Sequence, residues 1–345
     1  MSSTTNPTRL FEPVKLGRLN LSSRIVMGPL SSGLADEHNV LAPAAKDYYG
    51  QRGCVPGTLL IGEATFVSAK AGGTSESRSG IWSARQIAAW KEAVASVHQA
   101  GSYIYLQLWA LGRDADPELK RRAGAGDVVS SSAVPETENS TIPRPLTEDE
   151  IWEYVDDYVA AAKTAVEVAG FDGVELHGGN ASLIDQFTQD IVNQRKDQWG
   201  SSIPNRSRFA LEITRAICEA IGPDRVGFRI SPFSTYGGMG MKDAVPQFSH
   251  LLAGLKDLKI AYVHLVESRI AGRVDVEAGE SLDPFTELWG DASPIIVAGG
   301  YSPETARTAV DKQYRDRDVL VAFARQFVTN PDLVQKLKSG IPLTA

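Results

Sequence analysis

His177 and Asn180 stand three residues apart in the segment His177-Gly-Gly-Asn180, directly after a compact apolar run. Both side chains can donate a hydrogen bond, and two donors on one carbonyl or nitro oxygen withdraw electron density from a conjugated alkene. An isolated histidine is more often a structural residue, but a histidine and an asparagine at the end of one strand favour polarisation of a substrate. The spacing therefore predicts that His177 and Asn180 bind an activating oxygen.

Other residues after apolar runs suit a planar, anionic cofactor. Gln107 offers a donor and an acceptor to a heterocyclic edge, and Arg229 can stabilise the anionic reduced form of a flavin ring. Gly299 and Gly300 allow backbone N–H groups to approach a phosphate, and Arg325 can add a bidentate contact. Each residue alone fits an ordinary loop, but together at strand ends they indicate a cofactor site.

Eight short runs rich in Val, Ile and Leu alternate with helical patterns along nearly the whole chain. The runs do not alternate with polar residues, which is typical of strands buried on both faces. Eight strand–helix units predict an α/β fold, a (β/α)8 TIM barrel that forms a single domain over residues 1–345. The predicted strands are 23–28, 58–63, 102–108, 172–177, 225–231, 261–267, 294–300 and 318–323.

A doubly wound sheet is the alternative α/β fold, and it usually carries a phosphate-binding fingerprint after the first strand. Here that strand is followed by Pro29-Leu30-Ser31-Ser32, and the glycine-rich segment 237–240 is interpreted as a loop. The connection from about 109 to 146 is long, rich in charge, Gly, Ser and Pro, and shows no convincing helix. In a barrel, such a connection after the third strand is expected to lie over the catalytic face as a lid.

Several helix ends can be identified from the sequence. Glu150 stands three residues after Thr147, which is the spacing of a capping box, and Gly101 and Gly340 are expected to end helices. The predicted N-terminal caps are Ser83, Thr147, Ser302 and Asn330.

Composition excludes several classes of protein. The chain of 345 residues carries 35 basic and 42 acidic residues, and a net charge of −7 argues against a nucleic-acid or anionic-membrane surface. The two cysteines, Cys54 and Cys218, exclude a disulfide framework or a zinc site, and no metal site is expected. No run approaches roughly 18 apolar residues, and the polar start has no signal-peptide pattern. We expect a cytoplasmic enzyme for a small molecule, either monomer or homodimer.

Ordered motifs along almost the whole chain resemble the Old Yellow Enzyme family, the FMN-dependent NAD(P)H:enone oxidoreductases, and fungal members most of all. The resemblance runs from Leu10 to about Gly340. So many matches in the same order are unlikely to arise by chance. The most specific segments are 24–30, 107–113, 173–180, 185–187, 205–209, 228–232, 297–300 and 327–333.

The resemblance implies FMN across the barrel mouth, with NADPH or NADH as the reductant. The flavin ring would then transfer hydride to the β-carbon of an α,β-unsaturated carbonyl compound. Ser31 stands where many members have Thr or Cys, so its hydroxyl is expected to tune the flavin potential. The resemblance assigns the ring to Pro29, Leu30, Ser31, Ala64, Gln107 and Arg229, the phosphate to Gly299, Gly300, Ala324 and Arg325, and the substrate to Trp109, His177 and Asn180.

The chain departs from the family at the expected catalytic acid, because Ser182 stands where members usually have a tyrosine. An aliphatic hydroxyl is shorter and far less acidic than a phenol, so Ser182 is a poor proton donor. The proton would come from water, from another residue such as Tyr236 or Tyr301, or not at all. The alternative function is therefore a redox-neutral, FMN-containing isomerase or cyclase, or a flavin-dependent dehydrogenase, acting on a bulky natural-product intermediate.

Two further alternatives are weaker. A flavin-binding protein without catalysis would not need to keep His177, Asn180 and Arg229 together, and a cofactor-free lyase would need a Schiff-base lysine or a metal cluster. Ala324 replaces the glycine usual before the phosphate arginine, and relatives usually continue past Ala345 with an aromatic tail. The pocket is therefore expected to be more open, or to be completed by a neighbouring subunit. His38 and His264 are interpreted as structural or surface residues.

Overall fold

Eight parallel strands form a closed barrel in the computed structural model, which describes residues 8–74, 77–272, 274–277 and 279–344. The last strand pairs with the first, so the predicted (β/α)8 barrel is confirmed. The polar start at residues 1–7 lies outside the described residues. In chain order the barrel strands are β3 (Ile25–Met27), β4 (Leu59–Phe66), β5 (Tyr103–Trp109), β8 (Gly173–His177), β9 (Val226–Ile230), β10 (Tyr262–Val266), β13 (Ile295–Ala298) and β14 (Val319–Phe323).

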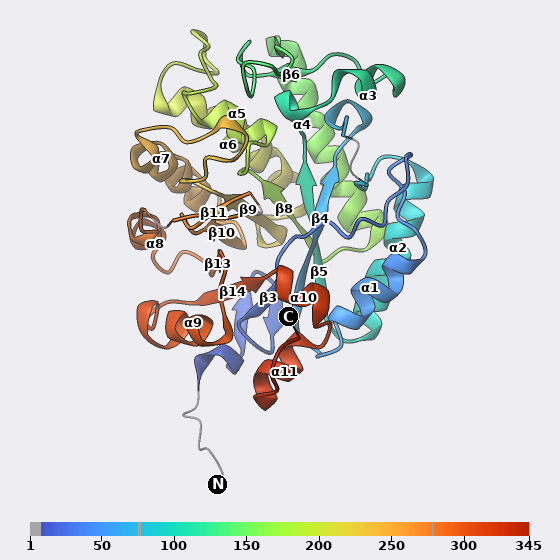
Figure 1. The fold of residues 1–345 in the computed structure, drawn as a ribbon, viewed down its shortest axis with the longest axis vertical. Coiled ribbons are helices and arrows are strands. Elements are labelled where there is room, and N and C mark those ends of the chain that lie inside the picture. The colour runs from blue at the N-terminus through green and yellow to red at the C-terminus, as the bar shows by residue number, and fades with distance from the viewer. Residues whose placement is uncertain (1–7, 75–76, 273, 278, 345) are drawn as a thin grey trace.

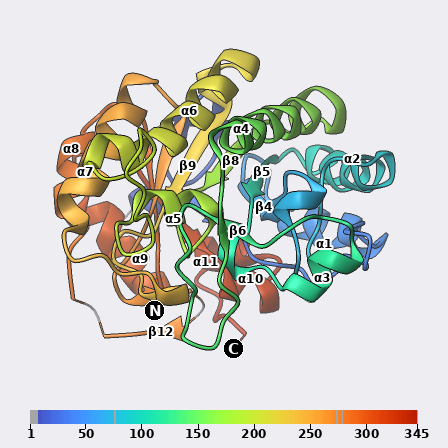
Figure 2. The same ribbon diagram turned by 90° about the horizontal axis from the view of Figure 1, so that it is seen from above.

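Helices surround the barrel (Figure 2) and bury their apolar faces against its outer surface. Ser83, Thr147 and Ser302 accept hydrogen bonds as the N-caps of three of these helices, as the sequence predicts. Each of the three also takes part in a capping box. The helices are α1 (Ala44–Arg52), α2 (Ala84–Gln99), α3 (Pro117–Arg122), α4 (Glu148–Lys163), α5 (Leu183–Thr188), α6 (Ile203–Ile221), α7 (Ala244–Asp257), α8 (Asp283–Trp289), α9 (Pro303–Thr308), α10 (Arg325–Thr329) and α11 (Leu333–Ser339).

The prediction for Asn330 is wrong, because α11 begins only at Leu333 and Asn330 does not cap it. The Asn330 amide instead binds the segment that follows the helix: its oxygen accepts from the backbone N–H of Thr344 at 2.8 Å and from Lys336 at 2.8 Å. Its nitrogen donates to the Thr344 carbonyl at 3.0 Å. A contact between residues far apart in sequence therefore overrides the local capping pattern.

A short hairpin of β1 (Val14–Leu16) and β2 (Leu19–Leu21) precedes the barrel, and the sequence pattern did not predict it. Its Val and Leu side chains pack with residues that point into the barrel, such as Tyr105 and Tyr262. The hairpin thus buries the amino-terminal end of the barrel interior. The open end lies opposite, at the carboxyl ends of the strands.

The long connection after β5 is not free of helix, because α3 (Pro117–Arg122) lies within it (Figure 1). Asp116 accepts from the backbone N–H groups of Glu118 and Leu119, and Pro117 occupies the first turn. This Asp-Pro-Glu sequence is a helix-start signal that the composition of the connection obscured. The connection ends in β6 (Val129–Ser130) and β7 (Arg144–Pro145), which pair with each other.

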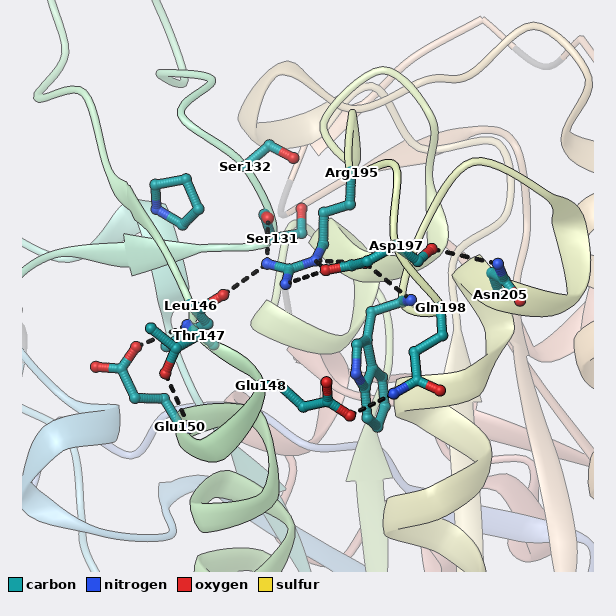
Figure 3. A network of polar contacts seen from close by, with 12 residues as sticks. Ser131, Ser132, Leu146, Thr147, Glu148, Glu150, Arg195, Asp197, Gln198 and Asn205 are labelled. Atoms are coloured by element: carbon teal, nitrogen blue, oxygen red, sulfur yellow. Dashed lines mark hydrogen bonds and ion pairs between the residues drawn. The ribbon is translucent and has the colours of Figure 1, made fainter.

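Arg195, in the segment between α5 and α6, fastens this connection to the rest of the fold (Figure 3). Its guanidinium donates to the backbone carbonyls of Ser131 at 3.1 Å and Leu146 at 2.6 Å. The same group pairs with Asp197 at 2.6 Å, which holds the guanidinium in this orientation. One side chain therefore joins the residues directly after β6 and β7 to the segment that follows α5.

Replacing Arg195 by Met is expected to loosen the β6–β7 segment. Hydrogen bonds to a charged donor contribute ~1.5–3 kcal/mol each, so we expect the free energy of unfolding to fall by ~1–3 kcal/mol. Chemical denaturation measures the loss, and hydrogen exchange should accelerate over residues 129–146. The matched control is Arg121→Met, which removes an exposed pair with Glu118 and should change stability by less than about 0.5 kcal/mol. Unchanged exchange in the Arg195 variant would contradict the assignment.

Candidate active site

A cavity of about 440 Å³ opens at the carboxyl ends of the barrel strands. Every barrel strand contributes to its lining, either with its last residues or with the residue directly after it. Parallel strands that close into a barrel bring these ends to one mouth, which is where barrel enzymes hold their reacting groups. The cavity is therefore the candidate active site.

Thirteen of the fourteen site residues predicted from the sequence line this cavity. They come from segments nearly 300 positions apart in the chain, and only the closed barrel brings them together. Their individual roles remain predictions. The thirteen are Pro29, Leu30, Ser31, Ala64, Gln107, Trp109, His177, Asn180, Arg229, Gly299, Gly300, Ala324 and Arg325.

His177 and Asn180 both present unsatisfied polar atoms. His177 Nδ1 and Asn180 Oδ1 are buried and have no hydrogen-bond partner among the described residues. The pKa of His177 lies well below its ordinary value, mainly because the ring is buried and secondly because the positive charge of Arg229 is near. The imidazole is therefore neutral at pH 7. Buried polar groups are normally paired, so a polar ligand atom is the natural partner of this residue pair.

The backbone after β8 takes an uncommon conformation that orients Asn180. Asn180 and Ala181 have φ values of 49° and 60°, in the left-handed region that non-glycine residues seldom occupy. Ser231 Oγ accepts from the Asn180 backbone N–H at 2.8 Å, and Asp185 accepts from that of Ala181 at 3.0 Å. Burial raises the pKa of Asp185 to about 7. These two hydrogen bonds hold the strained turn that carries Asn180.

Ser182, the fourteenth predicted residue, does not line the cavity. Its side chain is buried and serves as the N-cap of α5, where Oγ accepts from the Asp185 backbone N–H at 3.4 Å. The same hydroxyl donates its proton to the His177 carbonyl at 2.7 Å. Ser182 therefore stabilises the turn between β8 and α5, and its proton is directed at the backbone and not at the cavity.

Tyr236 and Tyr301, the two substitute proton donors considered from the sequence, both line the cavity. The Tyr301 hydroxyl donates to the Glu267 carboxylate, and burial raises the pKa of this phenol well above its ordinary value. Both effects disfavour proton transfer from Tyr301 to a substrate. Tyr236 is 42% exposed at the rim of the cavity.

Arg229 and Gln107 supply charge and polarity to the floor of the cavity. Arg229 Nε is buried and has no hydrogen-bond partner among the described residues. Burial lowers the pKa of this guanidinium, but the group stays protonated at any physiological pH. Gln107 Nε2 donates to Glu175 at 2.7 Å, which leaves the Gln107 carbonyl oxygen as the free end of its amide. A planar ligand that develops negative charge fits this pair.

The glycines after β13 form the other end of the cavity. Gly299 and Gly300 have φ values of 138° and 62°, and a Cβ on Gly299 would lie 2.6 Å from the Glu267 side chain. Only glycine fits this turn without strain. Arg325 reaches the same end, but its guanidinium is paired with Asp275 of β12 (Val274–Asp275) at 2.7 Å. The cradle of glycines with a nearby arginine suits the phosphate of a bound cofactor.

His264 is buried, which agrees with the structural alternative from the sequence and not with the surface one, and it also lines the cavity. Its ring is fully buried, and Nδ1 lies 2.8 Å from the Glu175 carboxylate. His264 lies two residues after Tyr262 in β10, so the two side chains point to the same side of the sheet, but only the closed barrel shows which side that is. Ser31 lines the cavity as well, with its hydroxyl 3.5 Å from Glu63.

The described residues contain no group of three or more His, Cys, Asp or Glu side chains that could hold a metal ion. Within the same residues, no helix combines the length and the apolar character that a membrane crossing requires.

The closed barrel, the unpaired polar atoms of the cavity and the glycine cradle together define a barrel enzyme that works with a planar, anionic cofactor. The model of the NADH:flavin oxidoreductase / NADH oxidase family matches residues 9–344. The chain therefore belongs to this family, as a fungal-type member of the Old Yellow Enzymes, and the resemblance stated from the motifs is confirmed. It is an oxidoreductase that uses FMN with NADPH or NADH as the reductant.

Individual relatives cover nearly the whole chain. A chanoclavine-I aldehyde reductase of Penicillium roqueforti is 53% identical over 97% of this chain and 90% of its own length. An NADP-dependent oxidoreductase of Aspergillus flavus is 48% identical over 98% of this chain and 91% of its own. The crystal structure of Old Yellow Enzyme from a Pichia species superposes with a TM-score of 0.90 at 35% identity, over 98% of this chain and 88% of that one.

Removing the carboxylate that pairs with Arg325 is expected to tighten FMN binding. Asp275→Asn frees the guanidinium and removes a negative charge near the proposed phosphate end. Because the pair is more than half exposed, we expect the dissociation constant to fall by only about two- to fivefold. Fluorescence titration of the apoprotein with FMN measures it. As the control, Glu277→Gln removes one negative charge from the same segment and should leave the dissociation constant for FMN unchanged. Weaker FMN binding by the Asp275 variant would contradict the placement of the phosphate near Arg325.

Proposed function

We propose that this chain is an ene-reductase-type oxidoreductase that acts on the activated C=C bond of an α,β-unsaturated carbonyl compound in natural-product biosynthesis, with NADPH as the reductant. The observation that carries the proposal is the pair of unsatisfied polar side chains, His177 and Asn180, that faces the cavity. The names of the fungal relatives, an aldehyde reductase and an NADP-dependent oxidoreductase, support the substrate class and the reductant.

Bound FMN supplies hydride transfer, and the residues of this chain supply binding and polarisation. Neutral His177 and the Asn180 amide would each donate a hydrogen bond to the carbonyl oxygen of the substrate. Two donors stabilise the negative charge that grows on this oxygen as hydride reaches the β-carbon. Arg229 and Gln107 would hold the ring of the cofactor, and Gly299, Gly300 and Arg325 its phosphate.

Trp109 would limit the size of the substrate. Its ring stacks on Phe66 with the centroids 5.2 Å apart and lies 6.0 Å from the His177 ring. The indole therefore borders the position where the carbonyl oxygen would bind. A rigid aromatic wall at this point selects the shape of the enone, which is consistent with a role as steric selector.

The α-carbon still needs a proton, and we propose that it comes from solvent through the open mouth. Ser182 cannot supply it from its observed position, because its hydroxyl donates to the His177 carbonyl. Slow protonation would let the hydride return to the cofactor, and this favours the second candidate, a redox-neutral isomerase or cyclase. Net reduction is the first candidate because the chain keeps every group needed for hydride transfer.

An anaerobic titration of the purified yellow protein, first with NADPH and then with cyclohexenone, tests the proposal. Bleaching of the flavin band followed by recovery on adding the enone would support net reduction. Bleaching without recovery would place the defect in proton delivery or substrate fit. A flavin-bound protein that NADPH does not bleach would overturn the reductase proposal and favour redox-neutral chemistry.

Asn180→Asp tests polarisation, because it keeps the size of the side chain and suits the left-handed backbone but replaces a donor by an acceptor. We expect the rate of reoxidation by cyclohexenone to fall about 10²-fold, as for the loss of one donor to a developing oxyanion. Stopped-flow absorbance measures the rate. The flavin content should stay at the wild-type level, and an unchanged rate in the flavin-loaded variant would remove Asn180 from the proposed mechanism.

Ser182→Tyr tests the missing acid. A phenol at this position should raise cyclohexenone reduction by about tenfold or more, since a positioned general acid contributes ~10²–10⁴-fold. Steady-state NADPH oxidation and product analysis measure the gain. Ser182→Phe is the matched control. It adds an aromatic ring and loses the same helix cap, worth ~1 kcal/mol, but has no acidic hydroxyl that could donate a proton. Equal rates in the two variants would show that proton supply does not limit the reaction.

A further inference from the structure

A buried carboxylate lies inside the barrel, directly beneath the cavity. Glu175 of β8 accepts hydrogen bonds from Gln107 Nε2 at 2.7 Å, from the Tyr262 hydroxyl at 3.0 Å and from His264 Nδ1 at 2.8 Å. The Glu175 side chain has no exposed surface. Gln107 and His264 line the cavity, whereas Glu175 and Tyr262 do not.

The strand register explains how this carboxylate reaches its donors. Glu175 lies opposite Gln107 on one side and Gly227 on the other, and Gly227 in turn lies opposite Tyr262. A Cβ at Gly227 would lie 2.1 Å from the Tyr262 ring, so the glycine leaves the space that the ring occupies. The Tyr262 hydroxyl can therefore reach the carboxylate across β9.

The carboxylate determines the polarity that two cavity residues present. Gln107 uses its N–H to bind Glu175, so its carbonyl oxygen remains as an acceptor for a donor on the cofactor ring. His264 uses Nδ1–H in the same way, so its Nε2, which has no partner among the described residues, carries only a lone pair. Without a negative acceptor below them, both side chains could turn over and present donors instead.

Glu175 also acts on Arg229, a cation that lines the cavity. Its negative charge is the electrostatic interaction that favours the charged form of Arg229. His177 lies beside Arg229 in the β8–β9 pairing, and Glu175 is two residues earlier on the same strand. In a low-dielectric interior these two opposite charges offset each other at the ring position.

We propose that Glu175 is a positioning residue that directs the Gln107 and His264 side chains and lowers the reduction potential of the bound FMN by offsetting the charge of Arg229. Two-electron reduction adds negative charge to the flavin ring. Arg229 would stabilise that charge, and the negative charge of Glu175, which interacts with Arg229, would weaken the stabilisation. The inference rests on the binding of FMN at this cavity and does not depend on which substrate reoxidises it.

Glu175→Gln tests the inference, since it keeps the volume of the side chain and removes its charge. We expect the reduced flavin to gain about tenfold in affinity relative to the oxidised form, which corresponds to a rise of about 30 mV for a two-electron couple. An anaerobic titration against a reference dye measures the potential. The flavin spectrum and the thermal unfolding midpoint show whether the variant is loaded and folded.

Two further variants keep the test decisive. Tyr262→Phe removes one donor but leaves the charge and the Gln107 contact. The affinity for reduced flavin relative to oxidised flavin should therefore stay within about threefold of the wild-type ratio. Glu175→Asp shortens the side chain by one methylene and moves the charge away from Gln107, so it should raise the potential by a smaller amount. If Glu175→Gln does not fold, the Asp variant tests the inference by itself.

An unchanged or lowered potential in a folded, flavin-loaded Glu175 variant would overturn the inference. A shift of equal size in Tyr262→Phe would also overturn it, because a merely structural disturbance would then explain the result. The measurement uses no enone. Failure of enone reduction with the predicted potential shift would therefore reject the proposed function and leave the role of Glu175 standing.

Discussion

The pairing of the last barrel strand with the first is the interaction on which the site depends. The Gly28 backbone N–H donates to the Phe323 carbonyl at 2.8 Å, and that of Val321 donates to the Arg24 carbonyl at 2.8 Å. These hydrogen bonds leave no open sheet edge and bring Pro29 and Arg325, from opposite ends of the chain, to one cavity. An open sheet of the same strands would hold the two residues at opposite edges.

In the proposed reaction, polarisation of the substrate and supply of the proton fall to different groups. His177 stays neutral because it is buried and lies near Arg229, so it adds no second positive charge to the cavity. The hydroxyl of Ser182 lies close in sequence but caps α5 and points to the backbone. In the proposed mechanism, this arrangement would support hydride transfer to a polarised alkene and leave protonation of the intermediate to solvent. Reduction and isomerisation would then be neighbouring outcomes.

The interior of the barrel holds a buried carboxylate, that of Glu175. A buried ionised group costs free energy even when it is well bonded, and an apolar replacement of equal volume is often as stable or more stable. Glu175 nevertheless sits among Gln107, Tyr262 and His264 beneath the cavity, with Gly227 leaving room for the tyrosine ring. Gln107 and His264 bind this carboxylate and also line the cavity, so the buried groups of the barrel interior are in direct contact with the lining of the site.

The sequence by itself determined the barrel, three of the four helix caps that it predicted, and thirteen of the residues that line the cavity. It could do so because buried parallel strands form apolar runs and their carboxyl ends fall at known positions. The tertiary structure alone decided the direction of Ser182, the pairing of Arg325 with Asp275, the place of His264 and the true contacts of Asn330. Each of these features depends either on contacts between segments that are distant in the sequence or on the rotamer of one side chain. Neither kind of feature produces a periodic pattern in the sequence.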